Sequence, residues 1–265
     1  MAKKIKFVLT IAGSDSSSGA GIQSDLKTFH NHGLYGLSVI TAVTAQNTIG
    51  IKSSFELPKE IFESQLKSLF EDFDIKVLKT GMLASEKIVE SLSSFLRNKG
   101  NTKVIIDPVI VSKSGYKMLN EKGINLMKTK LFPLAYLVAP NIAEAEAISG
   151  IEIRTAEDLE NAARAIYNNG CKNVLIKGGH MPESTGIERG ADFLFNGEKF
   201  FMFKTKFVKS KNTHGIGCTF TAAIASNIVL GYSLKKSIVN SKAYLVESLK
   251  KSQKIGKGFG PVEQV

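Results

Sequence analysis

Short apolar segments of strand length alternate with longer segments of helical periodicity along most of this 265-residue chain. Such alternation is typical of a mostly parallel sheet with helices on both faces. We expect strands over residues 6–11, 37–44, 75–79, 104–107, 136–139 and 173–177. We expect helices over residues 21–32, 58–71, 85–98, 142–149, 155–169, 217–230 and 233–251.

The pattern changes near residue 190, where two apolar segments, 191–195 and 199–203, flank Asn196-Gly197. An Asn-Gly pair between two such segments is the strongest short signal for a β-hairpin. We therefore expect an antiparallel extension at one edge of the parallel sheet. No linker or low-complexity segment divides the chain, so residues 1–265 are interpreted as a single α/β domain.

Composition argues against several classes of protein. Two cysteines, Cys171 and Cys218, are too few for a disulfide framework or a zinc site, which favours a reducing cytoplasm. The apolar run near the N-terminus is too short for a signal peptide or a membrane span, so no membrane partner is expected. The net charge of +11 comes mostly from scattered lysines, and there is no tryptophan to stack on bases. A solvated lysine-rich surface is therefore favoured over a nucleic-acid site.

The segment Thr213-His-Gly-Ile-Gly-Cys218 runs directly into an alanine-rich helical pattern. Glycine allows a tight bend, and the first N–H groups of a helix have no internal partner, so this turn predicts an anion-binding cradle. A helix N-terminus lowers a cysteine pKa, so Cys218 could take a proton from a hydroxyl group. An anion cradle beside a weak base suits phosphoryl transfer to an alcohol. The alternative is a glycine turn that caps an ordinary helix, with Cys218 as a small buried hydrophobe.

Polar and glycine-rich clusters follow the expected strands, at the edge where open α/β sheets bind ligands. Residues 12–25 form a Gly/Ser-rich loop, which is neither a Walker A loop nor a complete Gly-x-Gly-x-x-Gly because Ser24 replaces the third glycine. A loop that closes over a small substrate fits better. Gln46 offers an amide that suits a heteroaromatic ring edge, and Met82 offers a soft surface for a flat ring, although core packing also explains Met82.

Asp107, at the end of the fourth strand, is a candidate Mg²⁺ ligand. Asn141 and Glu144 could cap the following helix or reach a metal or phosphates, and Lys177 precedes a flexible glycine pair. The histidines do not have metal-site spacing, and the two late ones are interpreted as isolated loop residues: His30, His32, His180 and His214.

The chain resembles the hydroxymethylpyrimidine/phosphomethylpyrimidine kinases of thiamine biosynthesis, within the ribokinase-like superfamily. The stretches that carry this resemblance occur in family order over nearly the whole chain: residues 10–48, 79–83, 107–119, 140–146, 175–180 and 212–218. The resemblance implies a ribokinase-like fold, usually homodimeric, with ATP and Mg²⁺. It implies phosphorylation of 4-amino-5-hydroxymethyl-2-methylpyrimidine and then of its monophosphate.

The resemblance also implies roles for individual residues. The implied pyrimidine-binding residues are Gly13, Asp25, Gln46, Met82 and Val109. The implied catalytic turn is Gly215, Ile216, Gly217 and Cys218, with Cys218 as the base. The implied metal-binding residues are Asp107 and Glu144, and those for ATP and phosphate are Asn141, Lys177 and Thr213.

Two residues depart from the family pattern. Ile216 replaces the usual threonine of the turn, which keeps the N–H but removes a hydroxyl, and Ser18 replaces a usual glycine of the first loop. Pyridoxine or pyridoxal kinase activity is the near alternative, because pyridoxine also carries a hydroxymethyl group on a six-membered ring. A nucleic-acid-binding protein and a Rossmann oxidoreductase are more distant alternatives.

Overall fold

A computed structural model describes residues 5–112, 115–179 and 181–264. In these ranges one nine-stranded sheet has the order β3-β2-β1-β4-β5-β6-β7-β8-β9. The strands are β1 (Phe7–Asp15), β2 (Tyr35–Gln46), β3 (Ile51–Glu56), β4 (Val77–Thr80), β5 (Lys103–Ile106), β6 (Ala135–Val138), β7 (Val174–Ile176), β8 (Asp192–Phe195) and β9 (Phe200–Phe203). The main helices are α1 (Gly21–Asn31), α2 (Lys59–Asp72), α3 (Glu86–Leu96), α4 (Glu121–Leu126), α5 (Ile142–Ser149), α6 (Ala156–Tyr167), α7 (Ile216–Val229) and α8 (Leu234–Lys251).

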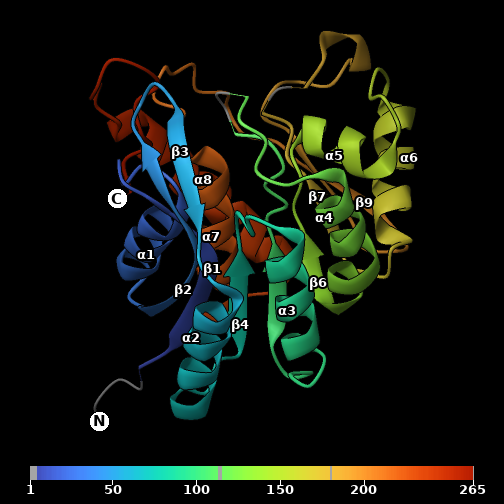
Figure 1. The fold of residues 1–265 in the computed structure, drawn as a ribbon. Helices are drawn as coiled ribbons and strands as arrows, with labels where there is room; N and C mark the ends of the chain where they lie inside the picture. Colours follow the sequence, from blue (N-terminus) through green and yellow to red (C-terminus); the bar gives the residue numbers. More distant parts are fainter. Residues whose placement is uncertain (1–4, 113–114, 180, 265) are drawn as a thin grey trace.

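The six central strands are parallel, which confirms the α/β class and the ribokinase-like architecture (Figure 1). The β8–β9 hairpin lies antiparallel at one edge, as the Asn196-Gly197 turn predicts. A second antiparallel edge was not predicted: β3 pairs antiparallel with β2 at the other side of the sheet. Most of the β3 side chains are exposed, so the segment lacks the apolar alternation by which a strand is identified.

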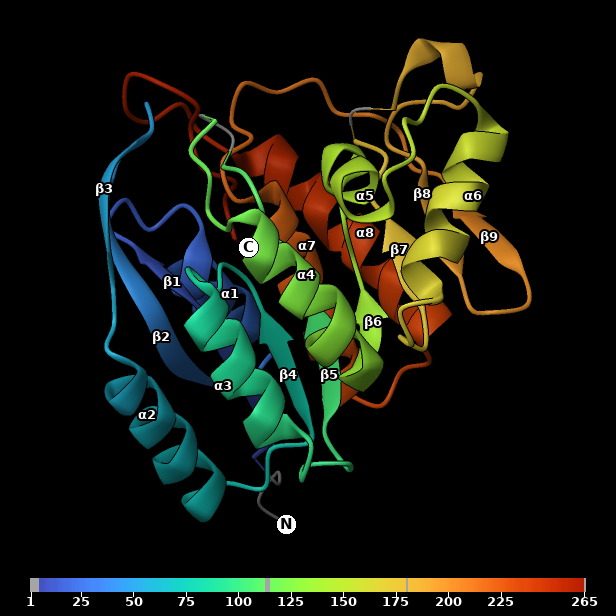
Figure 2. The ribbon, with the colours of Figure 1, turned by 45° about the vertical axis from the view of Figure 1, so that its right-hand side comes forward.

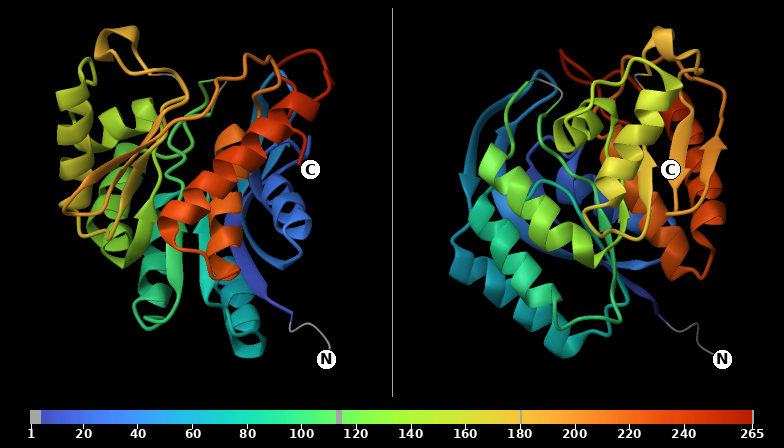
Figure 3. Two further views of the ribbon diagram at one scale, coloured as in Figure 1. Left: turned by 180° about the vertical axis from the view of Figure 1, so that it is seen from behind. Right: turned by 90° about the vertical axis from the view of Figure 1, so that its right-hand side faces the viewer.

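Alternating side chains of the central strands build one hydrophobic core on each face of the sheet. On β1, Leu9 packs with the core beneath α2, α3 and α6, whereas Val8 packs with the core beneath α1, α7 and α8. Figures 2 and 3 show these two helical layers on opposite faces of the sheet. The parallel sheet is therefore covered on both sides, as its apolar strands require.

Helix α7 lies deep in the second layer, between the sheet, α1 and α8. Every residue from Thr219 to Ile228 is buried, which explains why this helix is rich in alanine and other small residues. Small side chains allow close packing on all sides, so the N-terminus of α7 is held rigidly against the sheet.

Helix termini follow the expected capping chemistry, with Ser85 capping α3 and a capping box of Thr155 and Asp158 opening α6. The sequence patterns missed α4, which has six residues and continues through a π turn and a 3₁₀ turn up to β6. A helix this short gives too little periodicity to detect. Among the described residues, none of the helices is long and apolar enough to cross a membrane.

Candidate active site

The carboxyl ends of the parallel strands meet at the upper edge of the sheet in Figure 1, beside a cavity of about 640 Å³. A cavity of this size is typical of a small-molecule site. The cavity is lined by all but one of the residues with expected site roles: Gly13, Gln46, Met82, Asp107, Val109, Asn141, Glu144, Lys177, Thr213, Gly215, Ile216, Gly217 and Cys218. The exception is Asp25, which does not line the cavity.

The glycine turn forms the N-terminus of α7 and faces this cavity. Gly215 precedes the helix with a φ of 80°, and a Cβ atom there would lie 1.9 Å from the carbonyl oxygen of Gly19. Only glycine fits that position. In the described structure no side chain caps α7, so the backbone N–H groups of Ile216, Gly217 and Cys218 are available to an anion.

An ion pair lies directly beside the turn. Lys177 Nζ is 2.5 Å from Asp107 Oδ1, and Thr221 donates a hydrogen bond to Asp107 Oδ2 at 3.1 Å. A Cβ atom on Gly217 would be 3.4 Å from Lys177 Nζ and 3.7 Å from Asp107 Oδ2. The turn N–H groups and the lysine cation therefore converge on the same part of the cavity, as binding of a phosphate requires.

Asn141 and Glu144 form a capping box at the start of α5, so the helix-capping interpretation is confirmed. Both residues also line the cavity. Burial raises the pKa of Glu144 well above its usual range, and the neighbouring Asp107 adds to this, while Lys177 opposes it. One lysine cation thus faces two closely placed carboxylates, and this local excess of negative groups suits a divalent cation held together with phosphates.

Cys218 occupies the first turn of α7, as expected, but its expected acidity was wrong. Burial raises the pKa of the Cys218 thiol to about 11, although the nearby Lys79 and a backbone hydrogen bond from Gly21 act to lower it. The nearby carboxylates of Asp25 and Asp107 raise this pKa further. The resting protein therefore carries Cys218 as a thiol at neutral pH.

Asp25 and Lys79 form a fully buried ion pair close enough to Cys218 to influence its thiol. Lys79 Nζ lies 2.8 Å and 3.1 Å from the two carboxylate oxygens of Asp25, and Thr10 donates a third hydrogen bond at 2.6 Å. Protein groups thus donate three hydrogen bonds to the carboxylate of Asp25. The role in pyrimidine binding that the resemblance implies for Asp25 stays a prediction.

A second group of residues in the cavity lining suits a flat ring. A Cβ atom on Gly13 would lie 2.5 Å from Met82 Cε, so the missing side chain at Gly13 makes room for the methionine. Met82 is only 8% exposed, yet it lines the cavity, so it serves both the core and the site. Gln46, at the end of β2, and Val109, after β5, complete this part of the lining.

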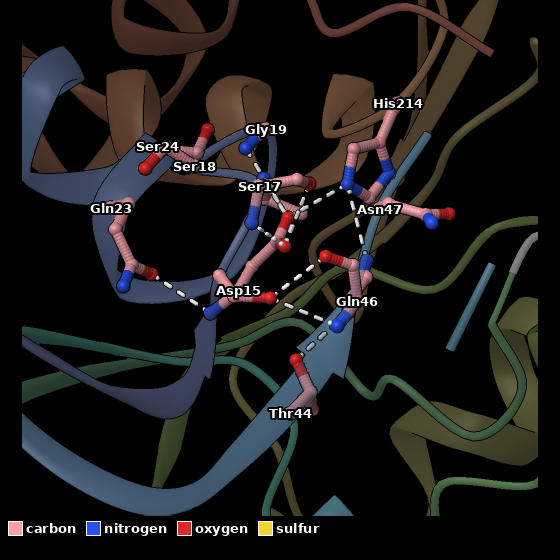
Figure 4. A network of polar contacts seen from close by, with 12 residues as sticks. Asp15, Ser17, Ser18, Gly19, Gln23, Ser24, Thr44, Gln46, Asn47 and His214 are labelled. Atoms are coloured by element: carbon pink, nitrogen blue, oxygen red, sulfur yellow. Dashed lines mark hydrogen bonds and ion pairs between the residues drawn. The ribbon is translucent and has the colours of Figure 1, made fainter. Parts of the chain in front are cut away.

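Sequence reasoning missed the network around Asp15, which Figure 4 shows. Ser17 and the backbone N–H groups of Gly19 and Ala20 all bond to the Asp15 carboxylate. His214 Nε2 lies 2.7 Å from Asp15 Oδ2, so the interpretation of His214 as an isolated loop residue was wrong. These two residues lie 199 positions apart, and no local pattern could have paired them.

Burial raises the pKa of Asp15, but the hydrogen bonds from His214 and Ser17 outweigh this and lower it to about 2. Ser18, one of the two departures from the family pattern, has a φ of 59°, a left-handed conformation that glycine adopts more readily. The Asp15 contacts hold the loop in this conformation. His180 lies outside the described residues.

The fold and the site together define a ribokinase-like kinase, an enzyme that transfers a phosphoryl group to a small molecule. More narrowly, the chain belongs to the phosphomethylpyrimidine kinase family, whose model matches residues 15–263.

Two curated relatives and one solved structure illustrate this similarity. Hydroxymethylpyrimidine/phosphomethylpyrimidine kinase of Aquifex aeolicus is 40% identical over 251 residues, which cover 95% of this chain and 97% of that protein. Thiamine biosynthesis bifunctional protein ThiED of Geobacter sulfurreducens is 42% identical over 97% of this chain, and the chain spans 52% of that longer protein. Pyridoxal kinase of Staphylococcus aureus, solved in complex with AMP-PCP and pyridoxal, has a TM-score of 0.88 and 32% identity, covering 99% of this chain and 94% of that one.

Proposed function

We propose that this protein uses ATP to phosphorylate the hydroxymethyl group of 4-amino-5-hydroxymethyl-2-methylpyrimidine and then phosphorylates the resulting monophosphate. The observation that carries this proposal is a single cavity that joins the 215–218 turn and the Asp107–Lys177 pair to the lining of Gln46 and Met82. One part suits phosphate and the other suits a ring, which is what transfer from ATP to an aromatic alcohol needs. The names of the relatives from Aquifex and Geobacter support the same assignment.

In this proposal the turn bears the charge that develops on the transferring phosphoryl group. The N–H groups of Ile216, Gly217 and Cys218 are preorganised by α7, so they need not rearrange during the reaction. Lys177 adds a positive charge beside them. The loss of a threonine hydroxyl at Ile216 leaves this backbone donation intact.

Cys218 accepts the proton of the acceptor hydroxyl. At pH 7 a thiol with a pKa of about 11 is ionised in only about one molecule in ten thousand. In a loose transition state the hydroxyl loses its proton late, so a base contributes less than in acyl transfer. The thiol orients the hydroxyl. In the reacting fraction Cys218 has first lost its own proton to solvent, and the thiolate then takes the hydroxyl proton as the new bond to phosphorus forms and becomes a thiol again.

Asp107 and Glu144 would hold a Mg²⁺ ion together with the nucleotide phosphates. When bound, this ion offsets the negative charge of the phosphates. Lys177 faces both carboxylates and offsets part of their negative charge before the nucleotide binds.

Pyridoxine or pyridoxal is the second candidate acceptor, supported by the similarity to the S. aureus kinase solved with pyridoxal. Gln46 favours the aminopyrimidine, whose amino group and adjacent ring nitrogen match the acceptor and donor of an amide. A coupled ATP-consumption assay with the aminopyrimidine, its monophosphate and pyridoxine distinguishes the two candidates. The proposal predicts a higher kcat/KM for the aminopyrimidine than for pyridoxine, and turnover of pyridoxine alone would contradict it.

A homodimer in the cytoplasm completes the proposal. Both cysteines are free thiols, and Tyr35, Val43, Phe55 and Ile61 on β2, β3 and α2 are large, exposed apolar residues. Such residues are typical of an interface between subunits. Sedimentation equilibrium should give twice the mass of the chain, and a monomer at micromolar concentration would contradict this part.

A further inference from the structure

The side chain of Gln46 places its amide nitrogen next to another hydrogen-bond donor, the ring nitrogen Nε2 of His214. His214 Nε2 lies 2.7 Å from Asp15 Oδ2 and 3.1 Å from Gln46 Nε2 (Figure 4). An ionised carboxylate only accepts hydrogen bonds, so His214 Nε2 must carry the hydrogen. The amide nitrogen of Gln46 is also only a donor, and it therefore has no acceptor in this direction.

A second conflict occurs at the other end of the same amide. Thr44 Oγ1 lies 2.9 Å from the carbonyl oxygen of Ser14 and 3.1 Å from Gln46 Oε1. Both of these oxygens are acceptors, but a hydroxyl group has one hydrogen. The hydrogen can therefore point at only one of these oxygens, and the other faces the hydroxyl with at most a weak, shared contact.

We propose that Asp15 and His214 fix the Gln46 amide with Oε1 toward His214 and Nε2 toward Thr44, and thereby make both residues positioning residues for ring recognition. A half-turn of the amide exchanges its oxygen and nitrogen without moving any other heavy atom, so hydrogen bonding decides the orientation. In this orientation His214 Nε2 points its one hydrogen at Asp15 Oδ2, 2.7 Å away, and Gln46 Oε1, 3.1 Å away, shares that hydrogen as a second, weaker acceptor. Gln46 Nε2 donates to Thr44, and Thr44 donates to Ser14, so no donor faces a donor and no acceptor faces an acceptor.

The orientation of the Gln46 amide matters for ring binding because one lone pair on Oε1 and one hydrogen on Nε2 stay available to the ring. The orientation fixes which side of the amide accepts a hydrogen bond from the ring and which side donates one. This step rests on the proposed function. The amino group of an aminopyrimidine can then donate to Oε1 while the adjacent ring nitrogen accepts from Nε2. A turned amide would place its nitrogen against the amino group and its oxygen against the ring nitrogen, so that donor would face donor and acceptor would face acceptor. The hydroxyl group of pyridoxine can donate or accept, so it tolerates either orientation. The Asp15–His214 pair therefore favours the aminopyrimidine over pyridoxine.

Nuclear Overhauser effects measured on the ligand-free wild-type protein test the orientation directly. The sample carries [¹⁵N]glutamine and methyl-labelled threonine, and loss of a signal in the Gln46→Glu variant assigns the Gln46 amide. We expect the Gln46 amide protons to show effects to the Thr44 protons. Effects to the His214 ring protons instead would overturn the inference, whatever the enzyme phosphorylates.

Kinetics test the consequence for specificity. His214→Phe keeps the ring but removes the donor, and kcat/KM for the aminopyrimidine should fall roughly 10- to 100-fold. The KM for ATP should not change, and kcat/KM for pyridoxine should fall less. His214→Gln restores an N–H group toward Asp15 and should recover part of the loss.

His32→Phe is the matched control, because it removes a ring nitrogen bonded to the Thr28 carbonyl outside the cavity, and it should leave both activities unchanged. Equal losses for both acceptors in His214→Phe would overturn the specificity role. If that variant does not fold, Thr44→Val removes the other partner of the amide and should shift specificity in the same direction. If the wild-type protein phosphorylates neither acceptor, the proposed function fails, while the Overhauser effects still decide the orientation.

Discussion

Replacement of Lys79 by methionine should destabilise the protein by about 3–5 kcal/mol, because it leaves Asp25 as a buried, unpaired carboxylate. Both side chains are fully buried, and Lys79 Nζ bonds both carboxylate oxygens at 2.8 and 3.1 Å. Two hydrogen bonds to charged groups are worth about 1.5–3 kcal/mol each, which gives about 3–6 kcal/mol and overlaps that range. Methionine fills most of the volume of the lysine stem, and Thr10 keeps its hydrogen bond to Asp25 at 2.6 Å.

Urea unfolding followed by circular dichroism at pH 7 measures this loss. The double variant Asp25→Asn/Lys79→Met should recover much of it, because no buried charge remains. Lys76→Met is the matched control, since Lys76 pairs with Asp74 on the surface and its loss should change stability little. A loss below about 1 kcal/mol in Lys79→Met, or a double variant less stable than the single one, would refute the reasoning.

The pH dependence gives an independent check with a definite sign. In Lys79→Met, burial raises the pKa of Asp25 without an opposing cation, so the folded state holds the proton more tightly than the unfolded state. An acid with a raised folded-state pKa stabilises the fold at low pH, and this contribution is lost as the pH rises. The deficit relative to wild type should therefore be smaller at pH 4 than at pH 7.

Three further predictions concern Asp15, Cys218 and Gly217. Asp15→Asn should lose about 2 kcal/mol of unfolding free energy at pH 7, because folding lowers the Asp15 pKa from 3.8 to about 2. This deficit should vanish as the pH falls through the folded-state pKa of about 2, and a deficit that does not depend on pH would contradict the prediction. In a Cys171→Ser background, alkylation of Cys218 by iodoacetamide should accelerate about tenfold per pH unit between pH 7 and 10, and a plateau near pH 8 would show a lower pKa. Gly217→Ala should stabilise α7 by about 0.5–1 kcal/mol while lowering turnover, because its methyl group would lie 3.4 Å from Lys177 Nζ; unchanged kcat/KM would show that phosphate does not bind there.

The sequence alone predicts those parts of the fold that are encoded locally. The apolar strands and capped helices were confirmed, and so was the turn at Gly215, because each depends on neighbouring residues. The edge strand β3 was missed because its side chains face solvent and its pairing with β2 supplies the structure. Strand pairing at a polar edge leaves no periodic signal in one sequence.

The same division holds for the site. The residues that follow the parallel strands could be placed together in advance, because parallel strands end at one edge of the sheet. The Asp25–Lys79 pair and the Asp15–His214 pair could not, since each joins distant parts of the chain. The acidity of Cys218 also required the structure, because the burial and the neighbouring charges that raise its pKa come from distant parts of the chain.

The most direct test of phosphoryl transfer at the α7 turn is the single-turnover rate of Cys218→Ala with ATP and the aminopyrimidine. Removal of a positioned base should lower this rate by about 10²- to 10⁴-fold. The affinity for ATP should persist, because the turn N–H groups come from the backbone. A wild-type rate in this variant would contradict the assignment of Cys218 as the group that receives the hydroxyl proton.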